Sequence, residues 1–224
     1  MISYEDIRAF QELYEGVNDP AIFKAVFLAG GPGSGKSFIV GKTALTALGF
    51  KVVNSDPVFE NALRKAGLTT SPEDIWSPKG QEIRGRAKEV TKSMMENYIN
   101  GRLGLVIDGT GKDADKISKQ KDMLEKLGYE TAMIFVNTDL DTAIERDKMR
   151  ARTVGAQEVS KMWKGVQSNM GRFQSMFGNK MFLIDNSIGS DFESHSLRVY
   201  KQMNRWANTS PKTQAAKKWI ESQR

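Results

Sequence analysis

The chain has 224 residues, of which 39% are hydrophobic and 27% are charged, a balance typical of a globular domain with one substantial core. It contains no cysteine and a single histidine, His195, which excludes disulfides, cysteine nucleophiles and histidine-based metal clusters. The formal net charge of +6 is compatible with a polyanionic partner, although a nucleotide-binding enzyme is often basic for its nucleotide alone.

The first residues have no basic and apolar leader pattern, and no apolar run approaches the length of a membrane span. We therefore expect a cytoplasmic protein that does not enter a membrane. Residues 4–15 carry apolar side chains at helical spacing among acidic ones, which predicts an amphipathic helix packed on the outside of the domain. Asn18-Asp19-Pro20 ends this helix.

An apolar strand, Ala25–Ala29, leads directly into Gly30–Ser37, which reads GGPGSGKS and fits the phosphate-binding loop pattern at every position. A helix is expected after it, through Leu48, with Gly49 as its stop. Such a loop turns backbone N–H groups toward a triphosphate, its lysine reaches the β- and γ-phosphates, and its hydroxyl suits Mg²⁺. We predict a triphosphate site formed by Gly31, Pro32, Gly33, Ser34, Gly35, Lys36 and Ser37.

Four more strands are expected, and helices alternate with them along the chain. The strands are Phe50–Asn54, Leu103–Asp108, Glu130–Val136 and Met181–Asp185. The helices are expected from Asp56, over about 80–100, 113–127, from Leu140, 156–177 and 190–207, with a loop containing Trp76 at 67–80. This alternation predicts a parallel α/β sheet covered on both faces. We expect a single domain, 1–207, followed by a basic tail at 208–224.

Asp108 ends the third strand, where phosphate-loop proteins place an acid that holds Mg²⁺ or its water opposite the loop serine. An ordinary Asp-Gly turn would look the same in sequence. With the loop upstream, the metal role is favoured for Asp108 together with Ser37.

Asp56 lies at the carboxyl end of the second strand, on the rim where a parallel sheet places its ligands. A carboxylate there can accept a proton from an attacking hydroxyl during phosphoryl transfer. The alternative is a helix cap, since Asp-Pro begins helices well. We favour the general base, because a kinase needs an acid at this position to accept the proton of the acceptor hydroxyl, and a simple hydrolase does not have this acid.

Basic residues crowd the segment before Thr153-Val154-Gly155, a flexible break. Arg146 and Arg150 lie one helical turn apart, and Arg152 follows. Such a segment can close as a lid at about 146–157 and bring guanidinium groups to the charge on the phosphates. A merely solvated face would have a similar composition. We expect Arg146 and Arg150 to act in catalysis and Arg152 to contact the nucleotide.

These motifs together resemble a group of small P-loop kinases that contains polynucleotide 5′-hydroxyl kinases, zeta toxins and related phage kinases. The match runs over about residues 24–186, through the loop, Val53–Asp56, Val106–Thr110 and Glu145–Arg150. The resemblance implies strand order 2-3-1-4-5, ATP with Mg²⁺ as phosphate donor and a hydroxyl as acceptor. It also implies Asp56 as the general base and an arginine lid.

One position departs from the group. Polynucleotide kinases carry an arginine three residues after the base aspartate, whereas this chain has Phe59. Related phage kinases act on hydroxymethyluracil in DNA, and Phe59 or Trp76 is a candidate to stack on an extruded base.

Three functions follow from these residues. The leading one is a kinase for a hydroxyl in nucleic acid, either a 5′-end or a hydroxymethylated base in DNA. The second is a small-molecule kinase, acting on a sugar nucleotide as zeta toxins do or on a nucleoside. The third is an NTP-hydrolysing switch. The basic residues Arg84–Lys92 and those of the tail either follow a phosphate backbone or form a solvated surface.

Overall fold

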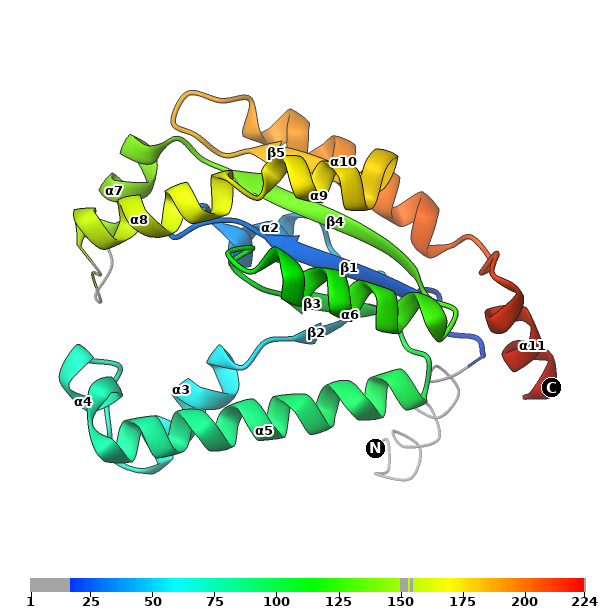
Figure 1. The fold of residues 1–224 in the computed structure, drawn as a ribbon, viewed down its shortest axis with the longest axis horizontal. Coiled ribbons are helices and arrows are strands. Elements are labelled where there is room, and N and C mark those ends of the chain that lie inside the picture. The colour runs from blue at the N-terminus through cyan, green and yellow to red at the C-terminus, as the bar shows by residue number, and fades with distance from the viewer. Residues whose placement is uncertain (1–16, 150–152, 154, 224) are drawn as a thin grey trace, which may run out of the picture.

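The computed structural model describes residues 17–149, 153 and 155–223. Within them, five parallel strands form one sheet in the order β2-β3-β1-β4-β5, as predicted. The carboxyl ends of the strands meet at the end of the molecule where α4 (Pro72–Trp76), α7 (Leu140–Lys148) and α8 (Ala156–Gln167) lie (Figure 1). The strands are β1 Lys24–Ala29, β2 Lys51–Val53, β3 Leu105–Asp108, β4 Glu130–Asn137 and β5 Met181–Asp185.

Helices cover both faces of this sheet, because successive strand residues point to opposite sides. Along β1, Ala25, Phe27 and Ala29 join one buried cluster, whereas Val26 and Leu28 join the other. The first face is covered by α5 Pro78–Asn100, α6 Ala114–Lys126, α8 Ala156–Gln167 and α9 Met170–Phe177, and the second by α2 Lys36–Lys42 and α10 Phe192–Ala207 (Figure 1).

A third, smaller cluster stands apart from the sheet. It joins α3 Asp56–Lys65, α4 Pro72–Trp76 and the first half of α5. Phe59, Leu63, Ile75 and Ala87 are its buried members. This unit lies across from α7 Leu140–Lys148 and α8, and the carboxyl ends of the strands lie between them (Figure 1).

The helix after the phosphate loop is shorter than predicted. It ends at Lys42, Ala44 takes a left-handed φ of 48°, and turns lead to Gly49. The Thr43 hydroxyl donates to the Ile39 carbonyl at 2.7 Å. Leu45 is then fully buried in the cluster that contains Ile39, so a tertiary contact decides where the helix ends.

The predicted helix over 156–177 is two helices, α8 and α9, separated at Ser168 and Asn169. The Asn169 amide donates to the carbonyls of Gly111 and Lys112, both at 3.0 Å. A side chain that bonds to a distant backbone in this way offers an alternative to the continuous helix.

Two segments expected to be irregular contain helices. Within the loop expected at 67–80, Ser71 caps α4 by accepting from the Asp74 amide. Within the basic tail, Thr213 caps α11 Gln214–Ser222. The Trp219 ring of α11 meets the Phe23 ring edge-on, with centroids 5.5 Å apart. The short helix η1 Gly178–Lys180 precedes β5.

The helix expected at residues 4–15 lies outside the described residues. None of the described helices is both long and apolar enough to cross a lipid bilayer.

Candidate active site

The phosphate loop connects β1 to α2 at the carboxyl edge of the sheet. Gly33 has a φ of +71°, and a Cβ there would lie 2.8 Å from the Ala143 carbonyl of α7. Gly35 has a φ of +83°, and a Cβ there would lie 2.5 Å from the amide nitrogen of Asn186. Both positions therefore require glycine for conformation and for space.

The Lys36 ammonium lies inside this loop. Its Nζ donates to the Gly30 carbonyl at 2.6 Å and to the Gly31 carbonyl at 3.3 Å. The Ser34 hydroxyl also donates to the Gly31 carbonyl, at 2.8 Å. The loop backbone thus holds this ammonium, and its predicted contact with the β- and γ-phosphates stays a prediction. The backbone of Ser37 follows it in the first turn of α2, and the predicted metal contact of Ser37 stays a prediction.

The side chain of Asn54 connects Asp108 to the backbone of Asp56. The Asn54 amide nitrogen donates to Asp108 Oδ2 at 2.8 Å, and the Asn54 side-chain oxygen accepts from the Asp56 backbone N–H at 2.8 Å. The amide nitrogen can only donate and the amide oxygen can only accept, so these two bonds fix the orientation of the amide. Asn54 therefore fixes the start of α3 relative to the end of β3.

The Asp108 carboxyl is half-buried, and its pKa is raised by burial. The negative charge of Asp56 raises this pKa further, whereas the positive charge of Lys36 and the hydrogen bond from Asn54 lower it. Lys36 and Asp56 thus both lie close enough to Asp108 to act on its charge.

The Asp108 carboxylate suits a magnesium ion. Mg²⁺ in phosphoryl-transfer sites is held by one or two carboxylates, with phosphate oxygens and water completing its shell. No group of three or more acidic or histidine side chains able to hold a metal occurs among the described residues. Asp108, whose charged form is disfavoured by burial, is the carboxylate that would gain most from a nearby cation.

The Asp56 carboxylate is exposed and is not used as a helix cap. Ser55 is the N-cap of α3, and Asp56 is the first helical residue. Within the described part of the chain, the Asp56 carboxylate makes no hydrogen bond; only its backbone N–H does. It is therefore available to a ligand.

Arg146 lies on α7 and contacts the phosphate loop itself. Its Nη1 donates to the Gly33 carbonyl at 3.1 Å, and its Nη2 donates to Asn186 Oδ1 at 3.4 Å. Asn186 in turn donates to the Ser34 carbonyl at 2.8 Å. Here Arg146 holds the loop from α7, and its predicted part in a closing lid stays a prediction.

The predicted lid starts and ends at well-anchored residues. The Asp147 carboxylate is buried and accepts from the Gly155 backbone N–H at 3.0 Å, which joins the end of α7 to the start of α8. Arg150 and Arg152 lie between these anchors, outside the described residues.

Three residues that sequence reasoning missed support the site: Asn54, Asn186 and Trp163. Trp163 of α8 donates to the Thr138 carbonyl at 2.7 Å, and a Cβ on Gly31 would lie 3.8 Å from the Trp163 Cα. Asn54 and Asn186 each directly follow a strand, at the rim that carries the phosphate loop. Their position after a strand could have identified the two asparagines from the sequence, whereas no sequence pattern marks Trp163.

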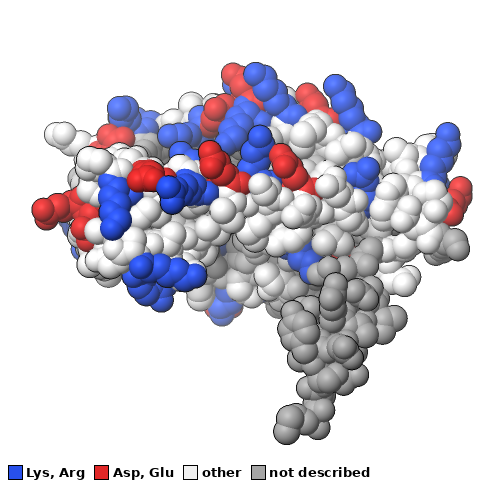
Figure 2. Space-filling model, turned by 90° about the horizontal axis from the view of Figure 1, so that it is seen from below, with Lys and Arg blue, Asp and Glu red and all other residues white. Residues whose placement is uncertain are grey.

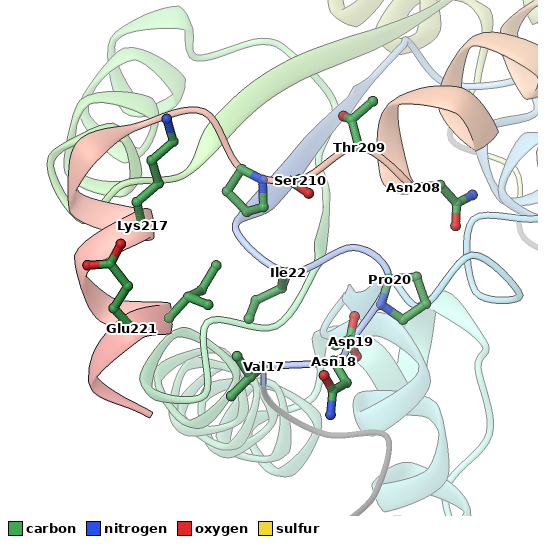
Figure 3. A pocket seen from close by; sticks show the side chains of 12 residues that line it. Val17, Asn18, Asp19, Pro20, Ile22, Asn208, Thr209, Ser210, Lys217 and Glu221 are labelled. Atoms are coloured by element: carbon green, nitrogen blue, oxygen red, sulfur yellow. The ribbon is translucent and has the colours of Figure 1, made fainter. Parts of the chain in front are cut away.

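A hollow of about 400 Å³ lies at the other end of the sheet. It is lined by residues that precede β1, including Asp19 and Ile22, and by residues of the C-terminal segment (Figure 3). Because ligands of parallel sheets bind at the carboxyl ends of the strands, this hollow is separate from the candidate site.

A family of AAA domains matches residues 26–170, well over half of the chain. The chain belongs to this AAA domain family. Among curated proteins, none matches it significantly.

Solved structures share the fold of this AAA domain. A gluconokinase from Sinorhizobium meliloti 1021 matches with a TM-score of 0.51 and 14% identity, covering 83% of this chain and 94% of the gluconokinase. A structure of the PezAT chromosomal toxin-antitoxin system of Streptococcus pneumoniae matches with a TM-score of 0.56 and 14% identity, covering 92% and 94%. A chain of the Pnkp1/Rnl/Hen1 RNA repair complex matches with a TM-score of 0.51 and 16% identity, covering 70% and 47%. At these identities the likeness establishes the P-loop kinase fold, as expected from the sequence.

Proposed function

We propose that this protein is an ATP-dependent kinase that transfers the γ-phosphate to a hydroxyl group, with Asp56 as general base. The observation that carries the proposal is the joining of Asp56 to Asp108 through Asn54, beside the Lys36 ammonium. A hydrolytic switch needs the loop and a metal-binding acid, but it does not need a second, free carboxylate at the same edge.

In the proposed reaction, Asp56 accepts the proton of the acceptor hydroxyl while the hydroxyl oxygen forms a bond to the γ-phosphorus. The bond between this phosphorus and the β–γ bridging oxygen breaks, and ADP leaves. Lys36 exchanges its loop carbonyls for phosphate oxygens and offsets the charge on the leaving group. Asp108, with Ser37, would hold Mg²⁺, which when bound neutralises charge on the phosphates.

The acceptor that we propose is a hydroxyl on a nucleic acid, either a 5′-end or a hydroxymethylated base. The whole chain has a formal net charge of +6, and a chain of the RNA repair complex is among the structures that share its fold. The segment 146–157 would close over the phosphates as a lid.

A specific observation also supports a small acceptor such as a sugar nucleotide. Two of the basic residues on α5 are already paired on the same helix, Arg86 with Glu82 at 2.6 Å and Lys92 with Glu96 at 3.8 Å. A cation that is already paired with a carboxylate contributes less affinity for a phosphate backbone than a free cation does. A small-molecule kinase is therefore the second candidate.

The test is transfer of label from γ-labelled ATP to a panel of acceptors: 5′-hydroxyl oligonucleotides, hydroxymethylated DNA, nucleosides and sugar nucleotides. We expect label in one class, and we expect Asp56→Asn to lower kcat roughly 10²- to 10⁴-fold with little change in the KM for ATP. Glu60→Gln, an exposed acid on the same helix, is the matched control and should keep wild-type kinetics.

Lys36→Ala should abolish transfer to every acceptor, which tests the loop but not the base. Unimpaired transfer by Asp56→Asn would remove the general-base assignment. Release of inorganic phosphate with no labelled acceptor would favour the switch.

A further inference from the structure

A guanidinium group from α5, that of Arg84, lies over an aromatic ring of α3 that is close in sequence to Asp56. Phe59 comes three residues after Asp56, so the two residues lie on neighbouring positions of the helix surface. The Phe59 ring is buried, and the Arg84 guanidinium carbon lies 4.8 Å from its centroid. The same carbon lies 5.9 Å from the ring of Trp76 on α4. Arg84 is therefore placed by two aromatic rings from two other helices.

The hydrogen-bonding capacity of Arg84 is largely unused. Its Nε is buried without a hydrogen-bond partner, and within the described part of the chain Arg84 forms no ion pair. Arg86 on the same helix differs, because Glu82 neutralises it. A guanidinium has five N–H donors in a fixed fork that matches the oxygens of a phosphate. An Arg84 held by rings rather than by carboxylates keeps its terminal Nη donors for a ligand.

Trp76 supplies a second contact surface beside this charge. The residue is 69% exposed, although Arg84 lies near one part of its ring. Phe59 differs, since it is 4% exposed and covered by Arg84, so it is a platform for the arginine and does not stack on a base. An exposed indole next to a cation suits a ligand with a flat aromatic ring and a phosphate.

We propose that Arg84 and Trp76 form the acceptor subsite and bind a nucleoside phosphate unit. Arg84 would contact the phosphate and Trp76 would stack on the base, with the acceptor hydroxyl directed toward Asp56. This inference rests on the proposed kinase function and gives it a substrate class. A nucleotide within a polynucleotide and a sugar nucleotide share this chemistry, so the experiment has one arm for each source.

The experiment measures binding in the presence of a non-hydrolysable ATP analogue. One arm uses a short 5′-hydroxyl oligothymidylate, and the other uses uridine diphosphate N-acetylglucosamine. The Arg84→Met variant keeps an unbranched apolar stem over Phe59 but has no charge, and we expect it to raise the Kd of the bound probe roughly 10- to 100-fold. Trp76→Ala should raise the same Kd roughly 5- to 100-fold. The probe that binds the wild type identifies the source.

Arg86→Gln is the matched control, since Arg86 lies on the same helix and is exposed and ion-paired. It should leave the Kd of the probe unchanged, and every variant should keep the wild-type Kd for the ATP analogue. Wild-type probe binding by Arg84→Met, with only a lower melting temperature, would show that Arg84 serves packing and would overturn the proposal. Failure of both probes to bind the wild type would also overturn it. Arg84-dependent probe binding in a protein that transfers no phosphate would support the subsite and refute the kinase function.

Discussion

At the scale of single residues, Asn54 determines how the two site carboxyls relate to each other. It donates to Asp108 and accepts from the backbone of Asp56, so neither end of its amide can turn without losing a bond. This arrangement disfavours the charged form of Asp108. Burial and the negative charge of Asp56 both raise the pKa of Asp108. Residues whose charge is disfavoured in the folded protein are common where a cation or a reaction is expected.

We therefore expect Asp108→Asn to be at least as stable as the wild type at pH 7, and more stable by up to about 1 kcal/mol, while it loses transfer activity. A raised folded-state pKa means that the folded protein binds the proton more tightly than the unfolded chain. The wild type therefore loses stability as pH rises from 3.8 through the raised pKa, and the asparagine variant does not. Denaturant unfolding without Mg²⁺ at pH 4 and pH 7 measures the difference. A clear loss of stability at pH 7 would show that the Asp108 charge is not strained.

At the scale of elements, Glu130 joins four segments at the amino ends of the strands. Its carboxylate accepts from Lys24 of β1 at 2.8 Å, from Trp206 of α10 at 3.0 Å and from the Lys212 backbone N–H before α11 at 2.8 Å. The Lys24 side chain is fully buried, and burial lowers its pKa. Burial raises the pKa of Glu130, but the hydrogen bonds from Lys24, Lys212 and Trp206 outweigh it and lower this pKa overall.

Replacing Glu130 with glutamine should cost about 3 kcal/mol, because the Lys24 ammonium then lacks its counter-charge in a buried site. A lowered folded-state pKa gives stability that is present above pH 4.5 and is lost as pH falls through the folded value. The wild type should therefore destabilise below pH 4.5 more steeply than Glu130→Gln does. Denaturant midpoints between pH 3 and pH 7 test both statements.

The control for this change is Glu193→Gln, which breaks the exposed pair between Lys42 and Glu193. An exposed pair is worth less than about 1 kcal/mol, so this variant should remain close to the wild type. Equal losses from the two variants would contradict a special role for Glu130.

At the scale of the whole molecule, the charge of +6 is not gathered into a long basic track on the face that α5 presents. Lys and Arg side chains alternate there with Asp and Glu (Figure 2). The ion pairs along α5 account for part of this mixture. On this face a nucleic-acid acceptor would therefore meet cations interspersed with carboxylates.

From this distribution we expect a shallow salt dependence of oligonucleotide binding. Each phosphate contact on a single strand contributes a slope of about −0.7 in a plot of log K against log salt, so one to three contacts give about −0.7 to −2. A titration of the oligothymidylate Kd against sodium chloride measures this slope. A flat response would exclude a nucleic-acid acceptor, and a slope steeper than about −4 would indicate an extended basic surface.

Much of the fold was predictable because its signals are local. The apolar strand runs and the glycine loop are continuous in sequence, and the alternation of strands and helices allows few topologies. The strand-end positions of Asp56 and Asp108 follow from this alternation. The helix of the C-terminal segment was missed because its stability comes from burying Trp219 against Phe23, which lies far away in the sequence.

The sequence by itself determined the sheet, the phosphate loop and the edge at which both carboxylates lie, since all three depend on patterns within a few neighbouring residues. Only the tertiary structure decided that Asn54 bridges the two acids and that Arg84 lies over Phe59. Arg84 is far from Phe59 along the chain, and its position follows from the packing of α3 and α4 on α5 around one small core. Contacts of this kind depend on how helices pack, and no local spacing in the sequence encodes them.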